Sequence, residues 1–583
     1  MTLWMRIILV LLLTSCVNFS KSGKGTEAWE TFETSLFADL WNLYPKWAFG
    51  LGHKDFAGQL KIPNRAYLLE QKEFLVKHQQ KLTALKYSDL TMQEQTDYEL
   101  VKNFIESSQW ELDTFKSYTW DPSQYNLGST LTEVLETKRL SGSEKLAAVV
   151  QKLKLVPAYY KAAFEQLQKP TQEHINLAVR QNQALADYLD KQFLDQALDL
   201  ATQLVQKKEI RELVQNASAA VRVYVSSLKS LEKNLAQKKD FRNFRIGRKL
   251  YAQKFKYDLD SQSTAEQIYQ KALAAKKDTH QEMIKIAQQL WPKYFAQQKP
   301  PKNNLLMIGK VLQKVSQKHT TPEDFVKTVR EQIPELWKFV ETKKLLTMDS
   351  KKPLVVRETP VFNRGFAGAG VNAPGPYDDK RETFYEVTPL DGMPAEKQQS
   401  YLREYNHYTL QILNIHEAVP GHYTQLVYSL KSPSLVKKVF GNGTMVEGWA
   451  VYTERMMLEE GYGNNEPELW LMYYKWRLRV VSNTILDYSL HNLDMDRKGA
   501  LKLLTEEAFQ EKAEAEEKWN RATYSQVQLA SYFTGFTEIY EYREELKKKM
   551  GQRFDLKTFH EKFLSFGSAP IHVIQTLMNK EMQ

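Results

Sequence analysis

Residues that interrupt helices are scarce in this chain, and their scarcity limits the folds open to it. The 583 residues include only 24 glycines and 20 prolines, whereas the good helix formers Lys, Glu, Gln, Leu and Ala are plentiful. Glycine and proline destabilise helix interiors. From about residue 27 to 345, apolar residues recur three and four positions apart, for example over residues 143–155. This spacing predicts amphipathic helices, and therefore a mainly α-helical protein.

One region, between about residues 350 and 392, departs from this pattern. Residues 353–357 and 384–388 are short runs rich in β-branched and aromatic side chains, which predict strands. Residues 365–376 between them are rich in glycine and proline. This segment lacks the Lys-Ser/Thr of a phosphate-binding loop, and its prolines remove backbone donors. We therefore interpret it as a hairpin or sheet edge, with helices resuming at about residue 395.

The composition is that of a globular protein, with 42% hydrophobic and 26% charged residues. No long linker divides the chain, so we expect one large domain over residues 27–583. A division into helical lobes 27–348 and 349–583 is the alternative. The net charge of +10 comes from lysines scattered through mixed-charge segments such as 544–549, which is typical of solvated helix faces. No basic stripe with interleaved aromatic residues is present, so a nucleic-acid partner is not expected.

The first residues form a targeting segment. Arg6 precedes the apolar residues 7–13, which are too few to span a bilayer and predict a signal peptide. Residues 13–16, Leu-Thr-Ser-Cys, resemble the lipobox of bacterial lipoproteins. This resemblance implies a signal peptide over residues 1–15, a lipid on Cys16, and a polar tether over residues 16–26. The protein would then be exported and anchored to a bacterial membrane in the cell envelope, on its periplasmic or surface face. The alternative is an ordinary secretory signal with an incidental cysteine.

Since Cys16 is the only cysteine, the body of the protein has no thiol for a disulfide, a metal or nucleophilic catalysis. Residues 401–418 predict a helix that ends in His416 and Glu417, and His422 follows six positions after the first histidine. Imidazole is a common zinc ligand, and an adjacent carboxylate is the usual general base. These residues therefore predict a zinc site.

The spacing of the two histidines does not fit a regular helix. Six residues advance the helix by about 600°, which leaves the side chains about 120° apart. Pro420 and Gly421 lie between them, and proline disrupts a helix while glycine lets the backbone bulge. We therefore expect a distorted helix over residues 418–421 that brings His422 back to His416. The alternative is two unrelated histidines at a helix end.

A third ligand is expected from a later helix, over residues 443–455. Glu447 and Glu454 are seven positions apart and share one face of this helix. We assign Glu447 as the third ligand of one zinc ion, and Glu454 as the carboxylate that orients a histidine. The alternative is that both are ordinary solvent-facing glutamates.

The two motifs, His-Glu-Ala-Val-Pro-Gly-His at residues 416–422 and Glu-Gly-Trp-Ala-Val-Tyr-Thr-Glu at residues 447–454, resemble the bacterial domain-of-unknown-function 885 family. That family is grouped with zincin-type peptidases. The step of 25 residues from His422 to Glu447 is also similar to that in neurolysin-like oligopeptidases. The resemblance implies a large, mainly α, two-lobed zincin-like fold around a deep channel, with a small β-sheet beside the active-site helix.

The likeness is most specific over about residues 400–575. It continues through Asp487 and His491, Arg521 and Gln528, residues 531–535 and 554–560, Gly567 and Pro570. The chain departs from the family pattern at three places, with Asn483 for an arginine, Tyr488-Ser489 for Thr-Gly, and Gln526-Val527 for Pro-Gly.

The resemblance also implies a mechanism. A zinc-bound water, activated by Glu417, would attack a carbonyl polarised by the metal, and Tyr532 would donate to the oxyanion. Asp487, His491 and Arg521 would support the site or contact the substrate, a peptide or small amide. The strand around residues 384–388 is a candidate to pair with an extended peptide. Two alternatives stay open, which are a zinc hydrolase of non-peptide amides or esters and an inactive metal-containing binding lipoprotein.

Overall fold

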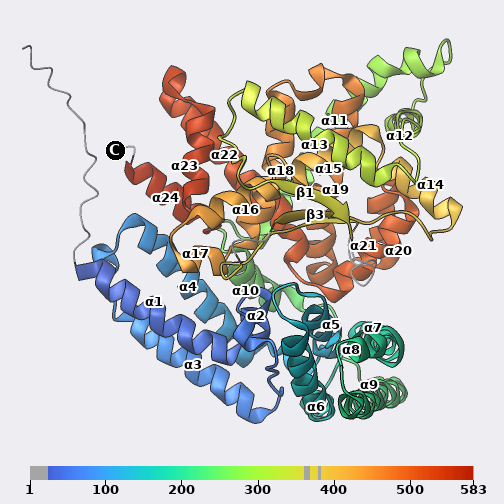
Figure 1. The fold of residues 1–583 in the computed structure, drawn as a ribbon. Coiled ribbons are helices and arrows are strands. Elements are labelled where there is room, and N and C mark those ends of the chain that lie inside the picture. The colour runs from blue at the N-terminus through green and yellow to red at the C-terminus, as the bar shows by residue number, and fades with distance from the viewer. Residues whose placement is uncertain (1–23, 360–367, 379–381, 582–583) are drawn as a thin grey trace, which may run out of the picture.

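The computed structural model describes residues 24–359, 368–378 and 382–581, and Cys16 and the predicted signal peptide lie outside this part. Helices dominate it, as predicted (Figure 1). They are α1 (Lys24–Leu43), α2 (Pro45–Gly50), α3 (Arg65–Thr83), α4 (Met92–Trp110), α5 (Gly128–Glu136), α6 (Gly142–Gln166), α7 (Gln172–Tyr188), α8 (Leu194–Asp199), α9 (Leu204–Lys238), α10 (Gly247–Leu259), α11 (Ala265–Phe295), α12 (Asn304–Val315), α13 (Phe325–Thr342), α14 (Ala395–Glu404), α15 (His407–Glu417), α16 (His422–Lys431), α17 (Leu435–Val439), α18 (Gly443–Glu459), α19 (Pro467–Asn492), α20 (Arg497–Lys502), α21 (Lys512–Tyr524), α22 (Ser531–Met550), α23 (Leu556–Ser565) and α24 (Ile571–Glu581).

Side-chain caps define several helix starts that the apolar periodicity alone leaves open. Ser141 and Glu144 form a capping box at the start of α6, which contains the predicted segment 143–155. Such reciprocal caps satisfy backbone N–H groups that have no partner inside the helix. At the N-terminus, α1 begins at Lys24, so the last three residues of the predicted tether 16–26 are helical.

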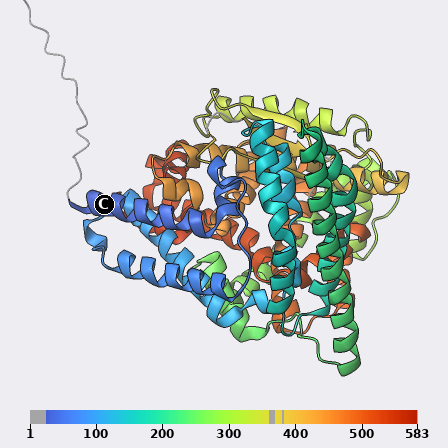
Figure 2. The ribbon, with the colours of Figure 1, turned by 60° about the horizontal axis from the view of Figure 1, so that its bottom comes forward.

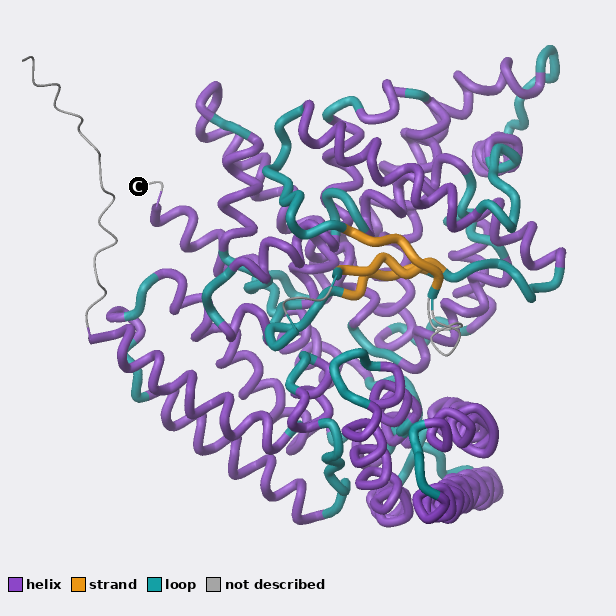
Figure 3. The backbone as a smooth tube through the Cα atoms, viewed as in Figure 1, coloured by secondary structure: helices purple, strands orange, loops and turns teal. Residues whose placement is uncertain are grey.

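The small sheet has three strands, β1 (Leu354–Glu358), β2 (Ala369–Asn372) and β3 (Thr383–Val387), in the order β1-β3-β2. β3 pairs in parallel with β1 and antiparallel with β2, and the sheet lies among the helices of the C-terminal half (Figure 3). Both expected strands are confirmed, and the Gly/Pro-rich segment supplies a sheet edge. The expected strand addition at residues 384–388 is wrong, because β3 is the central strand and both of its edges are already paired.

Two large hydrophobic cores, and a small cluster of Trp110, Phe115 and Trp120, hold the described residues together. The smaller core belongs to helices α5 to α9, which stand together as a bundle (Figure 2). The larger core joins α1 to α4 with the sheet and the helices from α10 onward. A boundary at 348/349 therefore does not separate the cores, because residues on both sides of it contribute to the larger one. The segment with its own core is instead the bundle of α5 to α9, which lies in sequence between two parts of the chain that share the larger core.

None of the helices in the described ranges is both long enough and apolar enough to serve as a membrane span.

Candidate metal centre

The predicted helix distortion lies between α15 and α16. α15 ends at Glu417 and α16 begins at His422, and the backbone at Ala418 and Gly421 is not helical. The Val419–Pro420 peptide bond is cis. A Cβ atom on Gly421 would lie 1.9 Å from the carbonyl oxygen of His416, so only glycine fits this close approach. The expected interruption of the helix at residues 418–421 is confirmed.

A second interruption was not predicted. The helix expected over residues 401–418 is divided into α14 and α15, which are separated at Tyr405 and Asn406. The Asn406 side chain accepts hydrogen bonds from the backbone N–H groups of Tyr408 and Thr409, so it caps α15. An asparagine followed by an apolar run is a start signal, and it could have revealed this break.

The turn between α15 and α16 brings the two histidines and Glu447 together. One ligand atom from each of the three residues lies within 4.8 Å of the others. The Glu447 Oε2 atom is 3.4 Å from His422 Nε2 and 3.7 Å from His416 Nε2. The two imidazole rings are nearly perpendicular, with centroids 4.7 Å apart. Residues from three separate helices thus converge on one point.

Glu454 holds the ring of His416 from behind. Its Oε1 atom lies 2.7 Å from His416 Nδ1 and accepts a hydrogen bond from Trp476 Nε1 at 3.0 Å. The Glu454 side chain is completely buried, which excludes the solvent-facing alternative for this residue. With Nδ1 engaged by the carboxylate, Nε2 of His416 points toward Glu447. Such a carboxylate–histidine pair fixes the orientation and the tautomer of a metal-binding imidazole.

Packing between α18 and α22 determines the position of Glu447. A Cβ atom on Gly448 would lie 2.4 Å from backbone atoms of Gly535, so the two helices touch through their backbones. The indole N–H of Trp449 donates to the carbonyl oxygen of Pro420 at 2.9 Å, which ties α18 to the α15–α16 turn. Neither glycine was predicted to contribute to the site. A glycine within a helix lowers stability by about 1 kcal/mol relative to alanine, so its presence there could have indicated that another backbone approaches closely.

The charges of the site act on one another. Burial raises the pKa of Glu417. Burial disfavours protonation of His416, but the neighbouring carboxylates, chiefly Glu454, outweigh it and raise the pKa of this histidine to about 9. Burial also opposes ionisation of Glu447, yet the positive charge of the neighbouring His422 and His416 keeps its pKa below the usual value. The centre therefore favours an ionised Glu447.

These residues line a cavity of about 320 Å³. Glu417 and Tyr532 face it together with His416, His422 and Glu447. Three apolar residues complete the lining and were not predicted, namely Val371, Leu426 and Val446. Val371 belongs to β2, so the sheet edge forms part of the wall. The Tyr385 hydroxyl of β3 donates to Asn414 on α15 at 2.9 Å and fixes the sheet beside the histidines.

Tyr532, the predicted oxyanion donor, is held by Arg521. The Arg521 guanidinium donates to the Tyr532 hydroxyl at 3.3 Å and to Gln528 Oε1 at 2.7 Å. Burial and the charge of Glu447 raise the pKa of Tyr532, so its hydroxyl keeps its proton at neutral pH. The structure thus brings Tyr532 and Arg521 together at the rim of the metal pocket.

Asp487 and His491 do not line the pocket. Asp487 accepts a hydrogen bond from the Tyr251 hydroxyl at 2.6 Å and lies close to the backbone of Val527. The Nε2 atom of His491 lies 3.2 Å from the carbonyl oxygens of both Ala522 and Ser525. The two side chains therefore anchor the backbone that leads from α21 to Tyr532.

Val527 lies in this anchored segment, at a position where the family pattern has glycine. Its φ of 72° is in the left-handed region, which a β-branched residue rarely adopts. The substitution therefore leaves the segment with a strained backbone at this residue.

Comparisons with known proteins place the chain in a family. The profile of a bacterial family of proteins of unknown function, DUF885, matches residues 45–578. A search of curated proteins finds no match. The solved structure of a predicted lipoprotein of unknown function from Shewanella oneidensis is 49% identical, with a TM-score of 0.87 over 94% of this chain and 99% of that one. That of a predicted lipoprotein from Colwellia psychrerythraea is 16% identical, with a TM-score of 0.80 over 96% of this chain and 99% of that one.

The family profile covers most of the chain, including every residue of the centre described above. The likeness to the Shewanella oneidensis protein extends over nearly the whole length of both chains. The protein belongs to the bacterial family of unknown function DUF885.

Proposed function

We propose that the protein is a zinc-dependent hydrolase that cleaves peptides. The observation that carries this proposal is the convergence of His416, His422 and Glu447, with Glu417 and Tyr532 facing the same cavity. Two histidines and a glutamate are a common ligand set of catalytic zinc, which leaves one position open. A structural zinc site is instead closed by four protein ligands. Within the described ranges, the candidate metal-binding group has only these three members.

The residues present fit a zinc ion. Glu447 Oε2 is buried and, among the described residues, has no hydrogen-bond partner, although buried carboxylate oxygens are normally paired. Zinc bonds of about 2.1 Å in a tetrahedron separate the ligand atoms by roughly 3.4 Å. The distances of 3.4 and 3.7 Å from Glu447 to the two histidines match this separation. A bound cation would therefore satisfy an otherwise unpaired buried atom.

The chain's own residues supply the remaining chemistry. Zinc, when bound, polarises a carbonyl oxygen and makes water more acidic. Glu417 is placed to accept a proton from water, and its raised pKa favours passing that proton on to a leaving amine. Tyr532 keeps its phenolic proton and can donate to an oxyanion. Glu454 holds His416 in orientation throughout the reaction.

The kinship with zincin-type and neurolysin-like peptidases, which the motifs suggest, favours a peptide as substrate over other amides or esters. The location proposed for this activity is the cell envelope. Both similar solved structures are of predicted lipoproteins, and residues 13–16 resemble a lipobox. We therefore propose that Cys16 carries the lipid that anchors the protein to a membrane.

The test compares wild type with Glu417→Gln, after chelation and after zinc is added back. We expect one zinc per chain in both proteins. Peptide cleavage by the variant should be about 10²–10⁴-fold slower, because only the general base is lost. Glu396→Gln, a change at an exposed glutamate on α14, serves as the matched control and should retain full activity.

Undiminished cleavage by Glu417→Gln would overturn the role of Glu417. Hydrolysis confined to esters or non-peptide amides in a substrate panel would support the second kind of hydrolase. Zinc binding without hydrolysis of any substrate in the panel would support a binding lipoprotein.

A further inference from the structure

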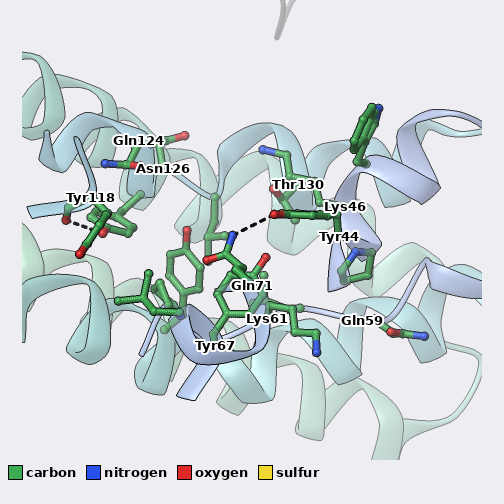
Figure 4. A pocket seen from close by; sticks show the side chains of 18 of the residues that line it. Tyr44, Lys46, Gln59, Lys61, Tyr67, Gln71, Tyr118, Gln124, Asn126 and Thr130 are labelled. Atoms are coloured by element: carbon green, nitrogen blue, oxygen red, sulfur yellow. Dashed lines mark hydrogen bonds between the residues drawn. The ribbon is translucent and has the colours of Figure 1, made fainter. Parts of the chain in front are cut away.

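A second and larger cavity, of about 700 Å³, lies in the N-terminal part of the protein (Figure 4). α2 and α3, the start of α5, the segment before it and part of α6 form its walls. It shares no lining residue with the metal pocket. Its volume lies within the range of sites for small ligands, roughly 300–1,000 Å³.

The cavity lies where the two hydrophobic cores meet. Tyr67 and Leu68 pack against the larger core, whereas Tyr125 and Leu127 belong to the smaller one. Aromatic rings dominate its apolar wall: Tyr44, Trp47, Tyr67, Tyr118, Tyr125 and Tyr159. Rings of this kind offer a large apolar surface together with polar edges, and cavities between packed units are frequent ligand sites.

Two charges that line the cavity form no ion pair within 4.0 Å among the described residues. Lys61 pairs with Glu70 at 2.9 Å, and Glu133 pairs with Arg139 at 3.3 Å. In the described part of the chain, no carboxylate lies within 4.0 Å of the Lys46 amine, although Glu133 attracts it from farther away. Glu111 likewise has no cation within that distance there. One amine and one carboxylate of the lining thus remain available to a ligand.

These two charges come from different walls of the cavity, Lys46 from α2 and Glu111 from the segment that follows α4. Glu111 Oε1 accepts a hydrogen bond from the backbone N–H of Ser117 at 3.0 Å, next to Tyr118. Tyr118 and Lys46 appear on opposite sides of Figure 4, with Tyr67 and Gln71 between them. A ligand that satisfied both charges would therefore carry one anionic and one cationic group.

Two hydroxyl groups lie on the Lys46 side of the cavity. The Thr130 side chain contributes to the wall, but the residue is only 2% exposed and its Oγ1 atom is not accessible from the cavity. Its Oγ1 atom has no hydrogen-bond partner among the described residues, although the neighbouring Thr132 hydroxyl donates to the carbonyl oxygen of Gly128. Thr130 lies on the same side of Figure 4 as Lys46. Tyr44 is also nearby, and since its hydroxyl accepts from Gln71, its own proton remains free to donate.

We propose that this cavity binds a short zwitterionic peptide with apolar or aromatic side chains. The peptide carboxylate lies against Lys46, with the hydroxyl of Tyr44 as a further donor. Its ammonium group lies against Glu111, and its side chains pack on the tyrosine rings. The site is separate from the metal centre, and the proposal does not require that the protein hydrolyse peptides.

The test is calorimetric titration of the full-length protein with free peptides of two to four residues, Phe-Phe, Phe-Leu-Phe and Phe-Leu-Leu-Phe. A chelator is included so that no peptide is consumed. N-acetylated and C-amidated forms of each peptide isolate the two charges. We expect each block to weaken binding to the wild type about tenfold or more, as for loss of a charged hydrogen bond.

The variants connect each block to one residue. Lys46→Met should weaken binding of peptides with a free carboxylate about tenfold and should leave binding of the C-amidated peptides unchanged. Glu111→Gln should weaken binding of peptides with a free amino group about tenfold and should leave binding of the N-acetylated peptides unchanged. Lys72→Met and Asp113→Asn are matched controls, because these residues pair with each other at 2.6 Å and do not line the cavity. His422→Ala tests separation from the metal centre and should bind peptide normally.

Equal binding of free and blocked peptides, or equal losses with the control variants, would overturn the proposal. Loss of binding in His422→Ala alone would assign the peptide to the metal pocket instead. Absence of any binding by the wild type would also overturn it, without bearing on zinc-dependent hydrolysis.

Discussion

The two cavities of this protein are built in opposite ways. At the metal centre, backbones touch through Gly448 and Gly535, and the ligand His416 is held by a buried carboxylate. The N-terminal cavity lies between the two large cores, where their side chains do not pack together. The Thr130 hydroxyl in its wall has no hydrogen-bond partner among the described residues. The first arrangement suits chemistry that needs fixed geometry, whereas the second suits a ligand that completes the packing.

The sharpest contrast is the response to a single added methyl group. Gly448→Ala should cost about 3 kcal/mol of stability, because its Cβ meets the backbone of Gly535 at 2.4 Å. Gly50→Ala, in the wall of the N-terminal cavity, should change stability by less than about 0.5 kcal/mol, since the nearest atom to its Cβ is 4.0 Å away. Denaturant unfolding measures both. Equal losses would remove the contrast between a tight and a loose wall.

The stability of the protein should depend on pH through Asp487, which lies behind the metal pocket. Burial raises the pKa of Asp487 to about 7, from 3.8 for an ordinary aspartate. The neutral acid therefore stabilises the fold fully below pH 4, and this contribution is lost as pH rises to 7. The loss is on the order of 4 kcal/mol.

Asp487→Asn keeps an acceptor for the Tyr251 hydroxyl and removes the titration. Urea unfolding of both proteins from pH 4 to pH 8 should show a smaller decline for the variant. Parallel curves would show that Asp487 does not titrate in this window.

Zinc affinity should depend on the support given to His416. Glu454→Gln is expected to weaken zinc binding 10–100-fold, because the amide holds the imidazole less firmly than the carboxylate does. Competition with a chelator measures this affinity. Glu133→Gln, in the N-terminal cavity, should leave zinc affinity unchanged, and a similar loss there would show that the two cavities are coupled.

The smallest effect concerns the unpaired hydroxyl. Thr130→Val should raise the stability of the ligand-free protein by about 1 kcal/mol, because a buried group without a hydrogen bond is removed. Thr132→Val should lower stability by a similar amount, since it deletes the hydrogen bond to Gly128. Thermal unfolding compares the two. A destabilised Thr130→Val would mean that this hydroxyl is already satisfied without ligand.

The sequence predicted what depends on local pattern. Helical periodicity, the two strands and the distortion at Pro420–Gly421 follow from neighbouring residues, and the structure contains all of them. The positions of His416, His422 and Glu447 were also predictable, because two short motifs carry them. The zinc ion and the hydrolysis remain predictions.

What escaped prediction depends on contacts between distant segments. The backbone contact of Gly448 with Gly535 joins residues far apart in sequence. The residues around either glycine do not indicate which segment it contacts. The central position of β3 depends on which strands pair across a long connection. The residues that line the N-terminal cavity are scattered between Tyr44 and Gln166, and they do not form a recognisable sequence motif.

The order of the strands has a consequence for any extended peptide near the metal centre. With β3 paired on both sides, β2 offers the sheet edge on the pocket side, because Val371 lines that pocket. β2 has four residues, and alternate residues of a strand direct their N–H and C=O groups to the same edge. Only two residues of β2 would therefore face a guest chain. N-methylation of successive peptide bonds would then slow cleavage at alternate positions only, and equal slowing at every position would exclude pairing with β2.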